Sequence, residues 1–303
     1  RLPAELRPGG GRLFLVGGAW RALAKAQMAR ANYPLRVLHE YRLDRAEALD
    51  LAQWGARSRP DKLAELPGVS GARAPTLPLG AALLEEILEA TGAEDVMVSA
   101  FGLREGVCLD NIPEALRGQD ALVAACRAQE ARRARAPGFG EELGAWLCQV
   151  LEPEREEARL LRAAALLCDV NWRTHPDYRT QGAWETVTRS SITDIGHRGR
   201  AFLGAALVAR HKSGRKGANG VPADLLDAEE QARARRAGLA MRLGSAIAGS
   251  APGVLGCCHV EREAGRLRLH LAGPARALAG AEVEKRLAAL AGALDLEATI
   301  AEG

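Results

Sequence analysis

Two glycine turns, each followed by an arginine, hold the residues best suited to chemistry. The first turn is Gly17-Gly18, which follows the apolar run Leu13–Val16 and precedes Arg21. Glycine lets backbone amides come close to a ligand, and a following helix points its free N–H groups and positive dipole end at the turn. Arg21 adds a forked donor that suits phosphate oxygens. This pattern indicates a phosphate site, and its alternative interpretation is a tight strand-to-helix turn that binds nothing.

The second turn follows a strand expected over residues 95–100. Ser99 lies near the end of that strand, and Gly102 and Arg104 belong to the turn after it. A helix with an apolar face, expected over 77–88, separates the two strands, which implies an α/β layer. Ligands of open α/β sheets bind beyond the carboxyl ends of the strands. We therefore expect both turns to form one phosphate site; the alternative for Arg104 is an ion pair with Glu105 or a neighbouring carboxylate.

Three segments resemble one family in their order and spacing. They are Val16–Ala24, Leu66–Ala74 and Val98–Val107, and the likeness continues through Leu166–Tyr178 to cover about residues 10–215. They resemble the Ppx/GppA phosphatases, which hydrolyse anhydride bonds of inorganic polyphosphate or guanosine pentaphosphate. The resemblance implies an exopolyphosphatase-type hydrolase, polyphosphate or guanosine pentaphosphate as substrate, Mg²⁺ as cofactor of the full-length enzyme, and a homodimer.

One part of the family pattern has no counterpart in this sequence. The family carries an Asp-x-Gly-Gly-Gly-Ser-like phosphate loop, with a glutamate base before it, and no such loop occurs here. The chain opens with Arg1, and its first methionine is Met28. We therefore expect a C-terminal portion without the N-terminal actin-like lobe, little hydrolysis by the portion alone, and no base that can be named. The alternative is a non-catalytic module that binds polyanions and dimerises.

The resemblance and the pattern of apolar residues together predict three domains. Residues 1–117 are expected to be α/β, the C-terminal part of lobe II of an actin-like (ribonuclease H-like) ATPase fold. Residues 118–250 read as an all-helical, HD-like domain, and residues 251–303 as a small α+β domain of β-β-α-β order. Its strands are expected over 254–260, 266–271 and 294–300. Asp44 and Ser58 are expected to cap the N-termini of two earlier helices.

The helical region differs from active HD enzymes at their metal-binding dyad. Cys168-Asp169 stands where those enzymes have His-Asp, and no histidine lies between His39 and His175. We therefore expect no bound transition metal, which disfavours an HD-type metal phosphohydrolase. Asp169 is expected to accept a hydrogen bond from Arg173 or His175. His175 is expected at the edge of the substrate site.

A basic segment among glycines lies within the helical region. Arg210, Lys212, Arg215 and Lys216 supply four positive charges, and His211 lies among them. Flexible cations suit a polymer whose negative charges repeat along its length. We expect this segment to bind the polyanion away from the bond that is cleaved, and the alternative is a solvated loop.

Composition and charge give no sign of nucleic-acid binding or of a membrane span. The net charge of +3 is too small to predict a nucleic-acid binder by itself. No apolar run approaches the roughly 20 residues that span a bilayer, so no membrane partner is expected. The 6 cysteines are scattered without a Cys-x-x-Cys pair, which is typical of reduced thiols in the cytoplasm.

Overall fold

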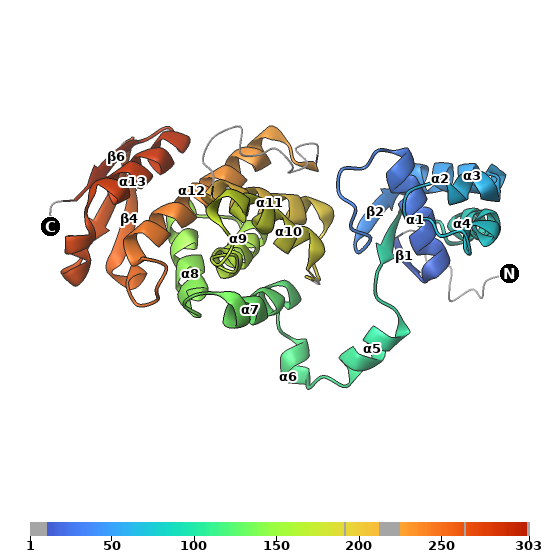
Figure 1. The fold of residues 1–303 in the computed structure, drawn as a ribbon, viewed down its shortest axis with the longest axis horizontal. Coiled ribbons are helices and arrows are strands. Elements are labelled where there is room, and N and C mark those ends of the chain that lie inside the picture. The colour runs from blue at the N-terminus through green and yellow to red at the C-terminus, as the bar shows by residue number, and fades with distance from the viewer. Residues whose placement is uncertain (1–10, 191, 212–224, 264, 302–303) are drawn as a thin grey trace. The chain divides into compact units, whose positions relative to one another are not determined.

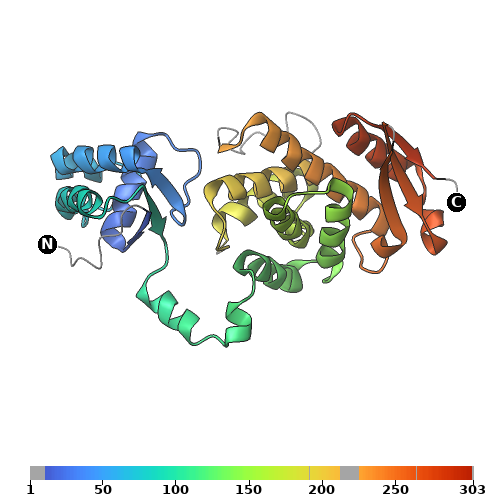
Figure 2. The ribbon, with the colours of Figure 1, turned by 180° about the vertical axis from the view of Figure 1, so that it is seen from behind.

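The computed structural model describes residues 11–190, 192–211, 225–263 and 265–301 (Figure 1). The chain forms two compact units, residues 1–119 and 120–303. Each unit combines helices with a small sheet, and most of the chain is helical (Figure 2). This agrees with the predicted mixture of α/β and helical segments. Among the described residues, no helix is long and apolar enough to cross a membrane.

The first unit is built on a sheet of three strands in the order β1-β3-β2. β1 (Arg12–Val16) runs parallel to the central strand β3 (Asp95–Ser99), and β2 (Tyr41–Asp44) is antiparallel to it. The helices of this unit are α1 (Gly18–Arg30), α2 (Arg45–Arg57), α3 (Pro60–Ala64), α4 (Leu77–Thr91), α5 (Leu103–Asp110), α6 (Glu114–Arg117) and the 3-10 helix η2 (Ala74–Thr76).

One face of this sheet forms the core of the first unit. Leu15, Val96 and Val98 are buried together with apolar side chains of α1, α2 and α4. α2 begins at Asp44, whose carboxylate accepts from the Glu47 amide at 2.8 Å while the Glu47 carboxylate accepts from the Asp44 amide at 2.9 Å. This reciprocal capping confirms the helix start predicted at Asp44.

The helix start predicted at Ser58 is wrong. Ser58 instead ends α2, where its hydroxyl donates to the Trp54 carbonyl oxygen at 2.7 Å. α3 starts at Pro60, with Arg59 as its N-cap. The proline decides the boundary because its fixed φ and missing N–H suit the first helical position.

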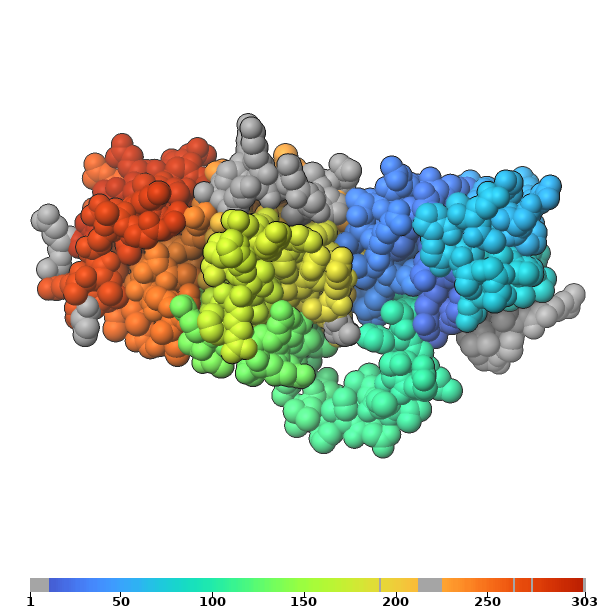
Figure 3. Space-filling view, viewed as in Figure 1, coloured from blue at the N-terminus to red at the C-terminus, as the bar shows by residue number. Residues whose placement is uncertain are grey.

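The other face of the sheet and the segment after it are exposed. Phe14 and Val16 project from β1 with exposed fractions of 59% and 47%. Every residue of α5 and α6 is exposed, and Leu103 is 85% exposed. Figure 3 shows the surface of these two helices in green-blue. The described part of the chain thus leaves apolar side chains uncovered at the end of the first unit.

The second unit packs a helical layer against a small sheet. Its helices are α7 (Ala121–Arg133), α8 (Phe139–Leu151), α9 (Arg155–Leu167), η3 (Pro176–Tyr178), α10 (Arg179–Arg189), α11 (His197–His211), α12 (Ala228–Ala248), η6 (Leu255–Cys257), η7 (Gly273–Leu278) and α13 (Ala281–Ala293). β4 (Cys258–Glu263), β5 (Arg266–Leu271) and β6 (Glu297–Ile300) form the sheet in that order. One hydrophobic core includes Leu143 and Leu147 of α8 and Leu267 and Leu269 of β5.

Along the chain, the elements β4, β5, α13 and β6 follow the predicted β-β-α-β order. β4, however, starts later than expected. Leu255–Cys257 forms a 3-10 turn, and the strand begins at Cys258. Gly253 has φ +94°, which turns the chain before that point. The Trp146 indole then donates to the Cys258 carbonyl oxygen at 3.1 Å and ties the strand to α8.

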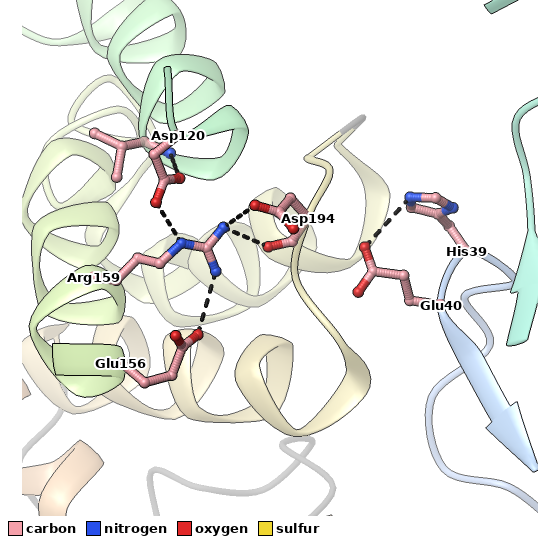
Figure 4. A network of polar contacts seen from close by, with 7 residues as sticks. His39, Glu40, Asp120, Glu156, Arg159 and Asp194 are labelled. Carbon is pink, nitrogen blue, oxygen red and sulfur yellow. Dashed lines mark hydrogen bonds and ion pairs between the residues drawn. The ribbon is translucent and has the colours of Figure 1, made fainter. Parts of the chain in front are cut away.

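One arginine of the second unit contacts three carboxylates. Arg159 of α9 contacts Asp120, Glu156 and Asp194, as Figure 4 shows. Asp120 is also the N-cap of α7, since its carboxylate accepts from the Val123 amide at 3.0 Å. Arg159 therefore joins the start of α7 to α9 and to the loop before α11.

Candidate phosphate site

The two predicted glycine turns leave the sheet side by side. β1 and β3 are parallel neighbours, and Val16 at the end of β1 pairs with Ser99 at the end of β3. Gly17 is the N-cap of α1 with φ +127°, a backbone conformation that other residues rarely adopt. The first turn of α1 therefore directs its N–H groups at the same sheet edge from which the second turn emerges.

Arg73, which was not predicted as a site residue, also lies at this turn. Its guanidinium lies so close to Gly18 that a Cβ on Gly18 would be 2.3–2.6 Å from the guanidinium atoms. A side chain at position 18 would displace the cation. Arg73 belongs to the Leu66–Ala74 segment already singled out, so its type and setting were visible in the sequence, whereas its contact with Gly18 was not.

Arg21 offers a donor that nothing in the described chain takes up. It lies in the first turn of α1, and its Nε atom is buried without a hydrogen-bond partner. A buried N–H without an acceptor is costly. An anion at the N-terminus of α1 would supply that acceptor.

The second turn carries its own anion. The Ser99 hydroxyl accepts from the Phe101 amide at 3.0 Å, and the Glu105 carboxylate accepts from the Gly102 amide at 2.7 Å. The hydrogen bond from the Gly102 amide is the largest cause that lowers the pKa of Glu105, and the charges of Arg104 and Arg21 lower this pKa further. Arg104 is exposed at the start of α5. The second turn thus adds one exposed cation and one capped amide to the site.

Two models of known protein families match the chain. The model of the Ppx/GppA phosphatase family matches residues 9–115, and that of the exopolyphosphatase C-terminal region matches residues 122–298. The second match alone covers more than half of the chain. The chain belongs to the Ppx/GppA phosphatase family. No match was found among curated proteins. The family is one of hydrolases, phosphatases of polyphosphate or related guanosine nucleotides.

Of the predicted polyanion contacts in this Ppx/GppA chain, Arg210 is not the exposed loop cation that we expected. α11 extends to His211, and the Arg210 side chain is only 11% exposed. Its guanidinium donates to the Ser245 hydroxyl at 3.2 Å and lies 3.7 Å from the Asp169 carboxylate. Lys212, Arg215 and Lys216 lie outside the described residues, so their role stays a prediction.

The expected partners of Asp169 are also wrong. Its carboxylate faces Arg210 and, at 3.8 Å, Arg135 rather than Arg173 or His175. Arg173 instead stacks over the Trp172 ring. His175 is exposed, and its Nδ1 atom accepts from the Asp177 amide at 3.3 Å, which caps η3. The structure therefore gives His175 a local capping contact, and its place at a substrate edge remains a prediction.

Metal ligands do not gather in the described part of this family member. Residues 11–190, 192–211, 225–263 and 265–301 contain no group of three or more histidine, cysteine, aspartate or glutamate side chains that could hold a metal ion. The glycine turns present amides and guanidinium groups, which suit anions rather than Mg²⁺. The Mg²⁺ cofactor remains a prediction.

The buried position of His211 should make the stability of the second unit depend on pH. Burial, followed by the charges of Arg210, Arg179 and Arg242, lowers its pKa to about 3. The unfolded chain binds this proton near pH 6.5, so it binds more protons than the folded chain between those values. Stability therefore falls as the pH drops below about 6.5. From this group we expect a loss of about 2.5 kcal/mol between pH 7 and pH 4.5.

Urea denaturation at both pH values measures this loss. His211→Gln should reduce the pH dependence by that amount, because glutamine does not titrate. His175→Gln, which replaces an exposed histidine, is the matched control. An equal pH dependence in the parent and in His211→Gln would contradict the assignment.

Proposed function

We propose that the first unit holds the terminal phosphates of inorganic polyphosphate in an exopolyphosphatase reaction. The observation that carries this proposal is the convergence of two guanidinium groups on the N-terminus of α1. Arg73 lies against Gly18, and Arg21 has a buried Nε atom without a partner. Polyphosphate is favoured because the match over residues 122–298 is to exopolyphosphatases. Guanosine pentaphosphate is the alternative substrate.

The chemistry follows from where the donors lie. Hydrolysis of a phosphoanhydride moves negative charge among the oxygens of the transferred phosphate and the leaving group, so fixed donors lower its barrier. The amides of the first turn of α1 would bind these oxygens directly. Arg21 and Arg73 would neutralise the charge on neighbouring phosphates. Arg104, exposed at the second turn, would contact the next phosphate along the chain. We assign no catalytic base.

Calorimetric titration of the 303-residue chain with tripolyphosphate tests the proposal. Arg21→Gln and Arg73→Gln should each weaken binding about tenfold, the loss expected for one charge-assisted contact. Gly18→Ala should weaken it similarly, because the new Cβ displaces the flexible end of Arg73. The control is Arg59→Gln, which removes an exposed arginine paired with Asp61. If all four variants bind tripolyphosphate with the affinity of the parent chain, this site is excluded.

The substrate is then decided by product release. Phosphate liberated by the full-length protein from long polyphosphate and from guanosine pentaphosphate should be measured side by side, with Mg²⁺ present. Faster release from polyphosphate, reduced in Arg21→Gln, supports the proposal. Faster release from the nucleotide would favour the alternative substrate. Binding without release from either substrate would favour a non-catalytic polyanion-binding module.

A further inference from the structure

A pocket of about 270 Å³ lies in the first unit, beside α1. Three segments line it: the second half of α1, the segment between α1 and β2, and the turn that follows α3. The arginines of the proposed phosphate site, Arg21 and Arg73, are not among the lining residues. Small-molecule sites begin at about 300 Å³, so this pocket fits only a small ligand.

Most of the lining side chains are apolar. Met28 and Ala29 come from α1, and Leu38 and Pro67 come from the two other segments. Met28 is only 5% exposed and packs in the hydrophobic core of the unit, so this part of the lining is well ordered. No lining residue carries a carboxylate, a hydroxyl or an amide side chain. The pocket is therefore suited to the apolar part of a ligand.

Two cations complete the lining. Lys25 shares one face of α1 with Met28 and Ala29, since residues three and four apart are neighbours on a helix surface. Arg36 comes from the segment after α1. Within the described part of the chain, neither Lys25 nor Arg36 has an ion-pair partner. An anion at this pocket would therefore meet two cations that no carboxylate of the described chain neutralises.

Gly68 allows the turn after α3 to lie against Lys25. Its φ is +85°, a conformation that favours glycine. A Cβ at this position would lie 3.1 Å from the Lys25 Cδ atom, which is tighter than most contacts of this kind. The aliphatic stem of Lys25 is thus packed against the turn. This packing reduces the conformational entropy that the side chain would lose on pairing with a ligand.

We propose that this pocket binds a small carboxylate with an apolar body, such as a fatty acid of medium length. The apolar body would lie against Met28, Leu38 and Pro67, and the carboxylate would pair with Lys25 and Arg36. A phosphate without an apolar body would leave the apolar side chains of the lining in water, so it fits this pocket less well. The proposal does not depend on the phosphate site at the N-terminus of α1.

Calorimetric titrations of the 303-residue chain with octanoate, 1-octanol and acetate test this proposal. Octanoate has both the charge and the apolar body, whereas 1-octanol lacks the charge and acetate lacks the body. Octanoate should bind about tenfold more tightly than 1-octanol, because the alcohol makes no charge-assisted contact, and acetate should bind more weakly than octanoate. Inorganic phosphate added to the octanoate complex should not displace octanoate.

Four variants locate the ligand. Lys25→Met and Arg36→Gln should each weaken octanoate binding about tenfold, the loss expected for one charge-assisted contact. Ala29→Leu should also weaken it, because the larger side chain takes up part of a small pocket. The control is Arg57→Gln, which removes an exposed arginine at the end of α2 that does not line the pocket. This variant should bind octanoate as the parent chain does.

Four results would overturn the proposal. The first is that octanoate does not bind. The second is that 1-octanol binds as tightly as octanoate, which would make the pocket a neutral apolar site. The third is that inorganic phosphate displaces octanoate, which would make it an inorganic anion site. The fourth is that Lys25→Met, Arg36→Gln and Ala29→Leu all bind octanoate as the parent does. Circular dichroism confirms folding of each variant, and if Ala29→Leu is unfolded, the other two variants decide.

Discussion

Gly140→Ala is expected to lower the free energy of unfolding of the second unit by about 3 kcal/mol. A Cβ at this position would lie 2.7 Å from the Leu166 Cα atom and 2.9 Å from the Ala165 carbonyl oxygen. These are backbone atoms, so α8 and α9 would have to separate. The methyl group would also lie 2.8 Å from the buried Glu130 carboxylate, which accepts from the amides of Gly138 and Gly140 at 3.1 and 2.7 Å.

Gly292→Ala is the matched control for that substitution. Gly292 lies inside α13, and nothing is within 4 Å of a Cβ built there. Alanine should stabilise the chain by about 0.5–1 kcal/mol, because it restricts the unfolded chain and favours the helix. Urea denaturation compares the two variants with the parent. A Gly140→Ala midpoint equal to that of the parent would show that α8 and α9 can separate at Gly140 without a loss of stability.

Arg200→Met is expected to cost about 3–4 kcal/mol. Arg200 of α11 is 1% exposed, and its guanidinium donates to the carbonyl oxygens of Val187, at 2.7 Å, and Ile192. Methionine keeps most of the volume but donates no hydrogen bond, so both carbonyl groups lose this donor. α10 ends two residues after Val187, so the end of that helix should loosen first.

Arg198→Met serves as the comparison, since it makes the same exchange two residues earlier on α11. Arg198 is 64% exposed and pairs with Asp227 and Glu230, and exposed ion pairs contribute less than about 1 kcal/mol. Thermal unfolding followed by circular dichroism should separate the two variants clearly. Similar losses in both would mean that the carbonyl contacts of Arg200 contribute little.

The sequence was sufficient for elements that have a strong local signal. β1 and β3 are short apolar runs that end at glycine or serine, and α4 carries a long apolar periodicity, so all three were predicted close to their observed bounds. β2 was missed because Tyr41–Asp44 contains only two apolar residues. A strand this short is recognised only by its pairing with β3.

Contacts between distant segments could not be predicted in the same way. The place of Arg73 against Gly18 depends on how the chain returns to the sheet after α3. Arg210 was predicted to be a loop cation because of its charged neighbours, but α11 continues past it. Its guanidinium instead pairs with Asp169 and donates a hydrogen bond to Ser245. Charge patterns indicate what a residue can bind, whereas burial decides whether it is accessible.

The carboxylate of Glu105 has a consequence for which anions the second turn would accept. Because it is tethered three residues from the Gly102 amide that it occupies, it acts as an internal competitor at a high effective concentration. In the proposed site, a weakly charged oxyanion would gain too little from Arg21 and Arg104 to replace it. A ligand with several linked phosphates would displace it, because each phosphate bound raises the local concentration of the next. The turn would thereby discriminate by the number of charges on the ligand rather than by its shape.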